Sequence, residues 1–136
     1  MWFSKKQAAA PTGQITTKRR GDAAEALACA YLTEQGLRLL ERNFATPGRG
    51  GGEIDLVMRA PDGTLVFVEV RQRSTASHGG AGGSITHAKQ RRIVFAARHY
   101  LMLFATLPPC RFDVVLVQGP VDAQTIEWLQ AAFDAS

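Results

Sequence analysis

The spacing of apolar residues along the chain predicts two helices, with strands between them and after the second helix. From Gly21 to Gln35 apolar residues recur at intervals of three and four, as on one buried helix face, and Gly36 supplies a stop. This stripe consists of Ala24, Leu27, Ala28, Tyr31 and Leu32. A first strand is expected over residues 37–44, and a loop over residues 45–52.

The clearest local signal is a β-hairpin. Two strand-like runs, residues 53–60 and 64–73, flank Pro61-Asp62-Gly63, a sequence that favours a tight turn. Because successive side chains of a strand point to opposite faces, one face of the hairpin carries both charged and apolar residues, namely Glu53, Asp55, Val57, Leu65, Phe67, Glu69 and Arg71. The other face carries apolar residues, namely Ile54, Leu56, Val66, Val68 and Val70.

The hairpin register brings two acids together. If the turn is symmetric about Asp62, Asp55 faces Glu69, and like charges placed opposite each other are unfavourable. A hard divalent cation removes this conflict, since Mg²⁺ binds one or two carboxylates together with waters and phosphate oxygens. The alternative is that both acids lie solvated or arginine-paired at an open edge, and a single β-bulge would send one of them to the other face.

The second half of the chain completes an α/β pattern. A Gly-rich loop (residues 74–83) precedes a helix that is expected to begin near Ser84 as N-cap and to end before Pro108-Pro109. Its apolar stripe consists of Ile93, Ala96, Ala97, Tyr100, Leu101 and Phe104. Strands are expected over residues 111–117 and 124–130. The predicted fold class is therefore α/β, a mixed sheet with flanking helices in the order αβββαβ plus a last short strand.

Charge divides the chain into an arm and a domain. Residues 1–20 carry five basic residues and no acid, which leaves 11 basic and 12 acidic residues for the remainder. We therefore predict a flexible basic arm over residues 1–18 and one domain over residues 19–136. The two cysteines are not clustered, and no signal peptide or membrane-spanning run is evident, so we expect a soluble cytoplasmic protein with free thiols.

Six blocks of the sequence resemble the YraN family of bacterial proteins. In order they are GDAAEALACAYLTEQG, ERNF, GEIDLV, LVFVEVRQR, HAKQRRIVFAARHYL and RFDVVLV, and the likeness covers roughly residues 18–133. That family is predicted to be endonuclease-like, within the PD-(D/E)xK restriction-endonuclease-like superfamily. The resemblance implies a restriction-endonuclease-like αβββαβ core, as in archaeal Holliday-junction resolvases.

The resemblance also implies roles for individual residues. Asp55 is similar to the metal-binding aspartate, Glu69 to the glutamate of the (D/E)xK motif, and Glu25 to an additional acid beside the metal, with Mg²⁺ or Mn²⁺ as cofactor. Arg71 occupies the position of the motif lysine. Its guanidinium can balance charge on a phosphate but cannot readily accept a proton. Lys89 could instead reach in from the second helix, and Arg71 could simply pair with Glu53.

The expected function is metal-dependent hydrolysis of phosphodiester bonds in DNA, including branched DNA by analogy with resolvases. For contact with the nucleic acid we select Arg73, Lys89, Arg91 and Arg92, which could also form an ordinary solvated helix face. His78 and His87 have no evident partner and receive no role, whereas Gln90 could orient a water or a phosphate. The alternative function is a non-catalytic nucleic-acid- or partner-binding module with a degenerate site. A homodimer would suit a two-strand cut, but no residue identifies an interface.

Overall fold

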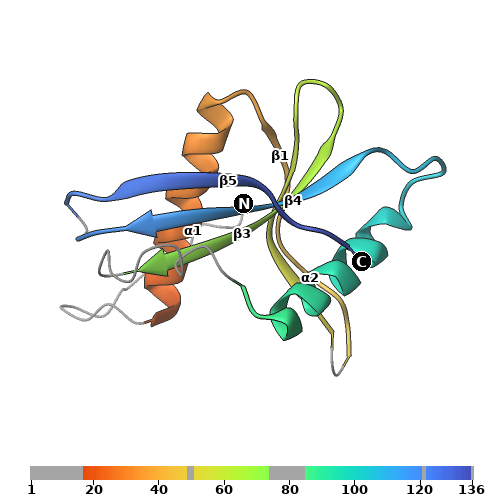
Figure 1. The fold of residues 1–136 in the computed structure, drawn as a ribbon, viewed down its shortest axis with the longest axis horizontal. Coiled ribbons are helices and arrows are strands. Elements are labelled where there is room, and N and C mark those ends of the chain that lie inside the picture. The colour runs from red at the N-terminus through yellow and green to blue at the C-terminus, as the bar shows by residue number, and fades with distance from the viewer. Residues whose placement is uncertain (1–16, 49–50, 74–84, 121, 136) are drawn as a thin grey trace, which may run out of the picture.

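The computed structural model describes residues 17–48, 51–73, 85–120 and 122–135, and within them the chain forms helices and strands in the predicted order (Figure 1). The elements are α1 (Thr17–Glu34), β1 (Arg38–Ala45), β2 (Glu53–Arg59), β3 (Leu65–Arg73), α2 (His87–Leu101), β4 (Cys110–Gln118) and β5 (Thr125–Phe133). The α/β class and the order of elements are confirmed. The predicted arm lies outside the described residues, except that Thr17 and Lys18 belong to α1.

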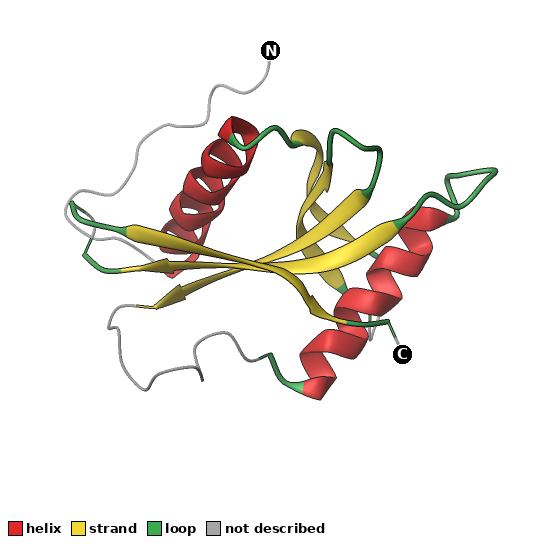
Figure 2. Ribbon diagram, turned by 45° about the horizontal axis from the view of Figure 1, so that its top comes forward, coloured by secondary structure: helices red, strands yellow, loops and turns green. Residues whose placement is uncertain are grey.

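The strands form one twisted sheet with the order β1-β2-β3-β4-β5. Strands β3 and β4 are parallel and the other neighbouring pairs are antiparallel, so the sheet is mixed. A parallel pair needs a crossover connection, which α2 provides. The two helices cover opposite faces of the sheet (Figure 2).

Helix α1 packs on its face through small residues. Ala24, Ala28 and Leu32 are buried along one line of the helix, against β2, β3 and β4 residues such as Leu56 and Val115. Leu27, which we expected on the buried stripe, is 36% exposed. The contact follows the i, i+4, i+8 line, where the two alanines permit close approach to the sheet, and Leu27 lies off that line.

Helix α2 buries the predicted stripe on the other face, but its ends differ from expectation. Ile93, Ala96, Ala97 and Tyr100 are buried there, together with Val94. The N-cap is Thr86 rather than Ser84, because the Thr86 side chain accepts a hydrogen bond from the Lys89 amide at 3.1 Å. The helix ends at Leu101, so Phe104 packs on this cluster from the turn that follows.

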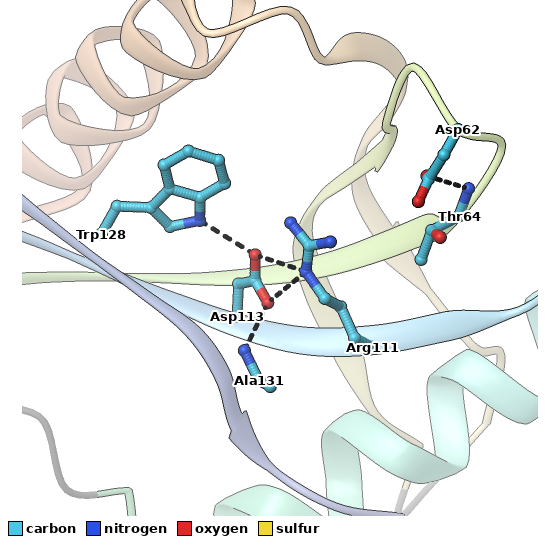
Figure 3. Close-up of polar contacts among 6 residues, drawn as sticks. All are labelled: Asp62, Thr64, Arg111, Asp113, Trp128 and Ala131. Atoms are coloured by element: carbon cyan, nitrogen blue, oxygen red, sulfur yellow. Dashed lines mark hydrogen bonds and ion pairs between the residues drawn. The ribbon is translucent and has the colours of Figure 1, made fainter.

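The outer strand β5 is longer than predicted, and a buried aspartate on β4 holds it. Asp113 is 0% exposed, and its carboxylate accepts hydrogen bonds from Trp128 Nε1 at 2.9 Å, the Ala131 amide at 2.9 Å and Arg111 Nε at 3.1 and 3.2 Å (Figure 3). Ala131 has a φ of 50°, and the register shifts between Phe112 and Val114. Three donors therefore converge on one charge and hold an irregular strand in place.

We expect Asp113→Ala to reduce the free energy of unfolding by about 1–3 kcal/mol, since it leaves a half-buried guanidinium and two N–H donors without their acceptor. Urea denaturation followed by circular dichroism measures this. Asp62→Ala is the matched control: Asp62 is exposed and accepts a hydrogen bond from the Thr64 amide at 3.0 Å in its turn (Figure 3). It is expected to change stability by less than about 1 kcal/mol. Equal losses in both variants would contradict a central role for Asp113.

Candidate functional site

The register of the central hairpin is as predicted. Leu56 pairs with Val68, Val57 with Phe67, and Arg59 with Leu65, so paired residue numbers sum to 124 as expected for a turn symmetric about Asp62. On the N-terminal side of Leu56, the pairing between β2 and β3 changes. The Val70 amide donates a hydrogen bond at 2.8 Å to Asp55 Oδ2, so a side chain acts as the acceptor at this point of β3.

This change also alters which side chains of β2 point to each face of the sheet. Leu56 and Met58 pack on the α1 side, but Ile54 packs with Val57 on the α2 side. The prediction that Ile54 shares the apolar face of Leu56 is therefore wrong. The alternation breaks at Asp55, next to a part of β1 where Asn43 has a φ of 53° and lies between the partners of Leu56 and Ile54.

The acids of β2 and β3 meet at this break. The carboxyl groups of Asp55 and Glu69 lie close enough for each to shift the pKa of the other. Glu69 is only 7% exposed. Burial, with the negative charge of Glu69, raises the pKa of Asp55 to about 7. Burial also raises the pKa of Glu69, against the opposing charges of Lys89 and Arg71. Burial and the neighbouring acid therefore favour a proton on Asp55.

A cation from α2 stands beside this pair. Lys89 Nζ lies 3.3 Å from Glu69 Oε2, which makes it the nearest charged partner given by the structure for that acid. Both residues line a cleft of about 410 Å³, which also includes Val70, Arg71, Gln72 and Thr86. Lys89 was selected from the sequence as a nucleic-acid contact, with an approach to the acids only as an option. The structure brings it to them.

Glu25 approaches the same region from α1. Its side chain is 13% exposed and lies 3.6 Å from Arg42 Nη2. Burial raises its pKa, and the negative charge of Asp55 raises it further. Among the described residues, no donor forms a hydrogen bond with Glu25 Oε1, which is buried. In that same part of the chain, no three His, Cys, Asp or Glu side chains are close enough to form a metal-binding group, so Glu25 does not join Asp55 and Glu69 in a set of three acids.

The remaining predicted residues do not form one cluster. Arg71 lines the cleft, and its charge lowers the pKa of Glu69. Arg73 is the last residue of β3 and is half-buried. Arg91 lines a different groove of α2. Arg92 is exposed and meets the loop after β1 through its backbone.

That loop determines where α2 lies. A Cβ on Gly52 would overlap the carbonyl oxygen of Arg92, so the loop backbone and the helix backbone are in direct contact there. Thr46 ties the loop, because its side-chain oxygen accepts the Gly52 amide at 2.8 Å. Arg92 lies three residues after Lys89, and the contact therefore sets the distance of Lys89 from the acids. Only glycine fits at this approach.

Comparison with known proteins gives the family. Residues 24–117 match the family described as "Uncharacterised protein family UPF0102". The chain belongs to the UPF0102 family. It is 67% identical to a UPF0102 protein of Polaromonas naphthalenivorans (strain CJ2) and 66% identical to one of Polaromonas sp. (strain JS666), in each case over 100% of both chains. This membership agrees with the YraN-family resemblance of the sequence blocks.

Among solved structures, this UPF0102 protein overlaps with the crystal structure of SSO0001 at a TM-score of 0.41 and 13% identity, over 88% of this chain and 54% of that chain. An overlap this loose supports no inference about fold or activity. No helix in the described part of the chain has both the length and the apolar character needed to span a membrane.

The raised pKa of Asp55 makes stability depend on pH in the metal-free UPF0102 protein. A group whose pKa is higher in the folded state than in the unfolded state stabilises the fold most at low pH, and that contribution is lost as the pH rises towards 7. Asparagine imitates the protonated acid. We therefore expect Asp55→Asn to become more stable than the wild type, by about 1.4 kcal/mol for each unit of pKa shift. The gain should grow between about pH 4 and pH 7 and then level off.

Urea titrations in EDTA across this pH range measure the difference. Glu127→Gln, a neutralised acid exposed on β5, is the control and should show no such trend. A constant difference between Asp55→Asn and wild type at all pH values would contradict the proton assignment.

Gly52→Ala tests the contact that positions α2. The added methyl group must push the loop and helix apart, so we expect a loss of stability of about 1–3 kcal/mol. Gly21→Ala is the matched control, since a Cβ there meets no atom within 4 Å and lies in α1, where alanine favours helix by about 0.5–1 kcal/mol. Thermal unfolding of both variants measures the effects. An unchanged melting temperature for Gly52→Ala would mean that the helix position is not set here.

Proposed function

We propose that this protein is a Mg²⁺-dependent nuclease that hydrolyses phosphodiester bonds in DNA, within the PD-(D/E)xK group that the sequence resembles. The observation that carries the proposal is the buried contact of Asp55 with Glu69. Two carboxyl groups this close resist being ionised together, and a hard divalent ion can replace the proton that one of them would keep.

The donor set fits such an ion. Mg²⁺ takes one or two carboxylates, several waters and substrate phosphate oxygens, and the cleft beside Glu69 leaves room for the last two. The buried Oε1 of Glu25, without a hydrogen bond from a described residue, supports a supplementary role for that acid at the edge of the site. A bound divalent ion supplies Lewis-acid polarisation of the phosphoryl group and a lowered pKa for the attacking water.

Lys89 supports the same reaction from the protein side. Its ammonium, 3.3 Å from Glu69, can donate to a phosphate oxygen and stabilise the negative charge that develops as water attacks phosphorus and the bond to the leaving oxygen breaks. In this proposal Lys89 supplies, from α2, the charge that the (D/E)xK motif would take from position 71. Arg71 lines the same cleft and binds the phosphate through its guanidinium.

DNA cleavage by the purified full-length protein tests the proposal. Duplex, single-stranded and branched DNA are incubated with Mg²⁺ or Mn²⁺, and products are resolved on denaturing gels. We expect metal-dependent cleavage that EDTA abolishes. Asp55→Asn and Glu69→Gln should each lower the rate at least about 100-fold, and Lys89→Met about 10–1000-fold, since each removes charge from the reacting centre. Glu127→Gln should cleave like the wild type.

Two results would overturn the proposal. One is cleavage that persists in Asp55→Asn, which would mean a contaminating or different activity. The other is DNA binding that is indifferent to EDTA and to Glu69→Gln, without cleavage of any substrate, which would favour the non-catalytic binding module. Calorimetric titration of Mn²⁺ into the wild type and into Glu69→Gln shows separately whether the acids bind the ion.

A further inference from the structure

A second groove runs along α2, on a side of the helix that the candidate site does not use. Its volume is about 410 Å³, and it lies between the helix and the residues that follow β5. The lining residues are His87, Gln90, Arg91, Val94, Phe95, Arg98, Asp134 and Ala135. The end of the chain passes close to α2 in this view (Figure 1). The proposed cleavage chemistry involves none of these side chains.

The groove combines positive charge with an exposed aromatic ring. Arg91 and Arg98 lie seven residues apart, two turns along one side of the helix, and Asp134 is the one acid in the lining. Phe95 is 44% exposed. Its ring centroid is 4.6 Å from that of His99, one turn further on, so the ring is supported on one side. A supported, exposed ring between cations is the arrangement that stacks bases and holds phosphates.

The groove and the cleft beside Glu69 lie on different sides of the same first turn of α2. Thr86 and Lys89 line the cleft, and His87 and Gln90 line the groove. A strand bound in the cleft can therefore reach the groove by crossing this one turn of the helix. Gln90 is held in place, since its Nε2 donates to the Ile85 carbonyl at 2.8 Å.

The size of the groove discriminates between forms of nucleic acid. A hollow of this volume is of the order of a small-ligand pocket. In a duplex the bases are stacked on one another and exposed only at their edges in the grooves, so none can stack on Phe95. An unpaired strand exposes the face of each base and can follow a narrow charged groove.

We propose that this groove binds an unpaired strand of the nucleic-acid substrate, with one base stacked on Phe95 and the flanking phosphates on Arg91 and Arg98. This inference rests on the proposed function, because it names the form of DNA that the nuclease acts on. We therefore expect the protein to prefer single-stranded DNA and the unpaired arms of branched DNA over continuous duplex.

Fluorescence anisotropy of the full-length protein in EDTA tests the groove without cleavage. The probes are a labelled oligothymidylate and a labelled duplex of mixed sequence. We expect Phe95→Ala to weaken oligothymidylate binding about tenfold, Phe95→Leu similarly, and Phe95→Tyr very little, because stacking needs a ring. Arg91→Gln with Arg98→Gln should lower the salt slope of single-strand binding by about 1.4, for two phosphates. Leu103→Ala, an exposed apolar residue after α2, is the control and should bind like the wild type.

The outcomes separate this inference from the proposed function. Unchanged oligothymidylate affinity in Phe95→Ala, or an equal loss for duplex, overturns the groove assignment even if Glu69→Gln abolishes cleavage. If the wild type cleaves no substrate but Phe95→Ala still weakens oligothymidylate binding, only the nuclease proposal is overturned. Sedimentation velocity measures whether the protein forms a dimer. If it does, and if Phe95→Ala dissociates the dimer without changing DNA affinity, then a second copy of the chain occupies the groove, which overturns the assignment to an unpaired strand.

Discussion

The candidate site of this protein depends on the point where the regular backbone pairing of β2 with β3 ends. At Asp55 a carboxylate replaces a backbone acceptor for the Val70 amide. The change of alternation sends Ile54 to the α2 side and holds Asp55 against Glu69. A regular hairpin would satisfy its own amides and leave no carboxyl group in its interior. The irregularity thus creates the acid pair, which costs stability in the absence of a cation and which, in the proposed function, provides the ligands for one.

The parts around this point are held by contacts that make the site rigid. Gly52 brings the loop after β1 against the α2 backbone, and α2 in turn brings Lys89 to Glu69. On β4, Asp113 holds the irregular strand β5 through two donors of that strand, Trp128 Nε1 and the Ala131 amide. Asp113 and Glu69 are both buried acids on central strands, yet they differ in chemistry. Asp113 is surrounded by donors that satisfy its charge, whereas Glu69 has an acid and an ammonium at the wall of an open cleft. The first is a structural charge, and the second is the one to which our proposal gives a chemical role.

Helix α2 has three different contact surfaces. One side packs on the sheet, the first turn presents Lys89 to the acids, and another side forms the groove with Phe95 and two arginines. The basic residues that the sequence suggested as one contact surface are therefore divided. Arg91 belongs to the groove, Arg92 lies beside the loop contact, and Arg71 belongs to the cleft. Helical geometry separates neighbours in sequence by 100°, so adjacent arginines serve different surfaces.

The sequence by itself determined the order of elements, the α/β class and the hairpin register, because apolar periodicity and the Pro61-Asp62-Gly63 turn are local signals. That register also sufficed to pair Asp55 with Glu69. Only the tertiary structure decided that Thr86 caps α2, that Ile54 changes sides, that Lys89 reaches Glu69 and that Asp113 is satisfied by β5. Each of these depends on a contact between segments far apart in the chain or on a choice between nearby caps, and local spacing carries no information about either.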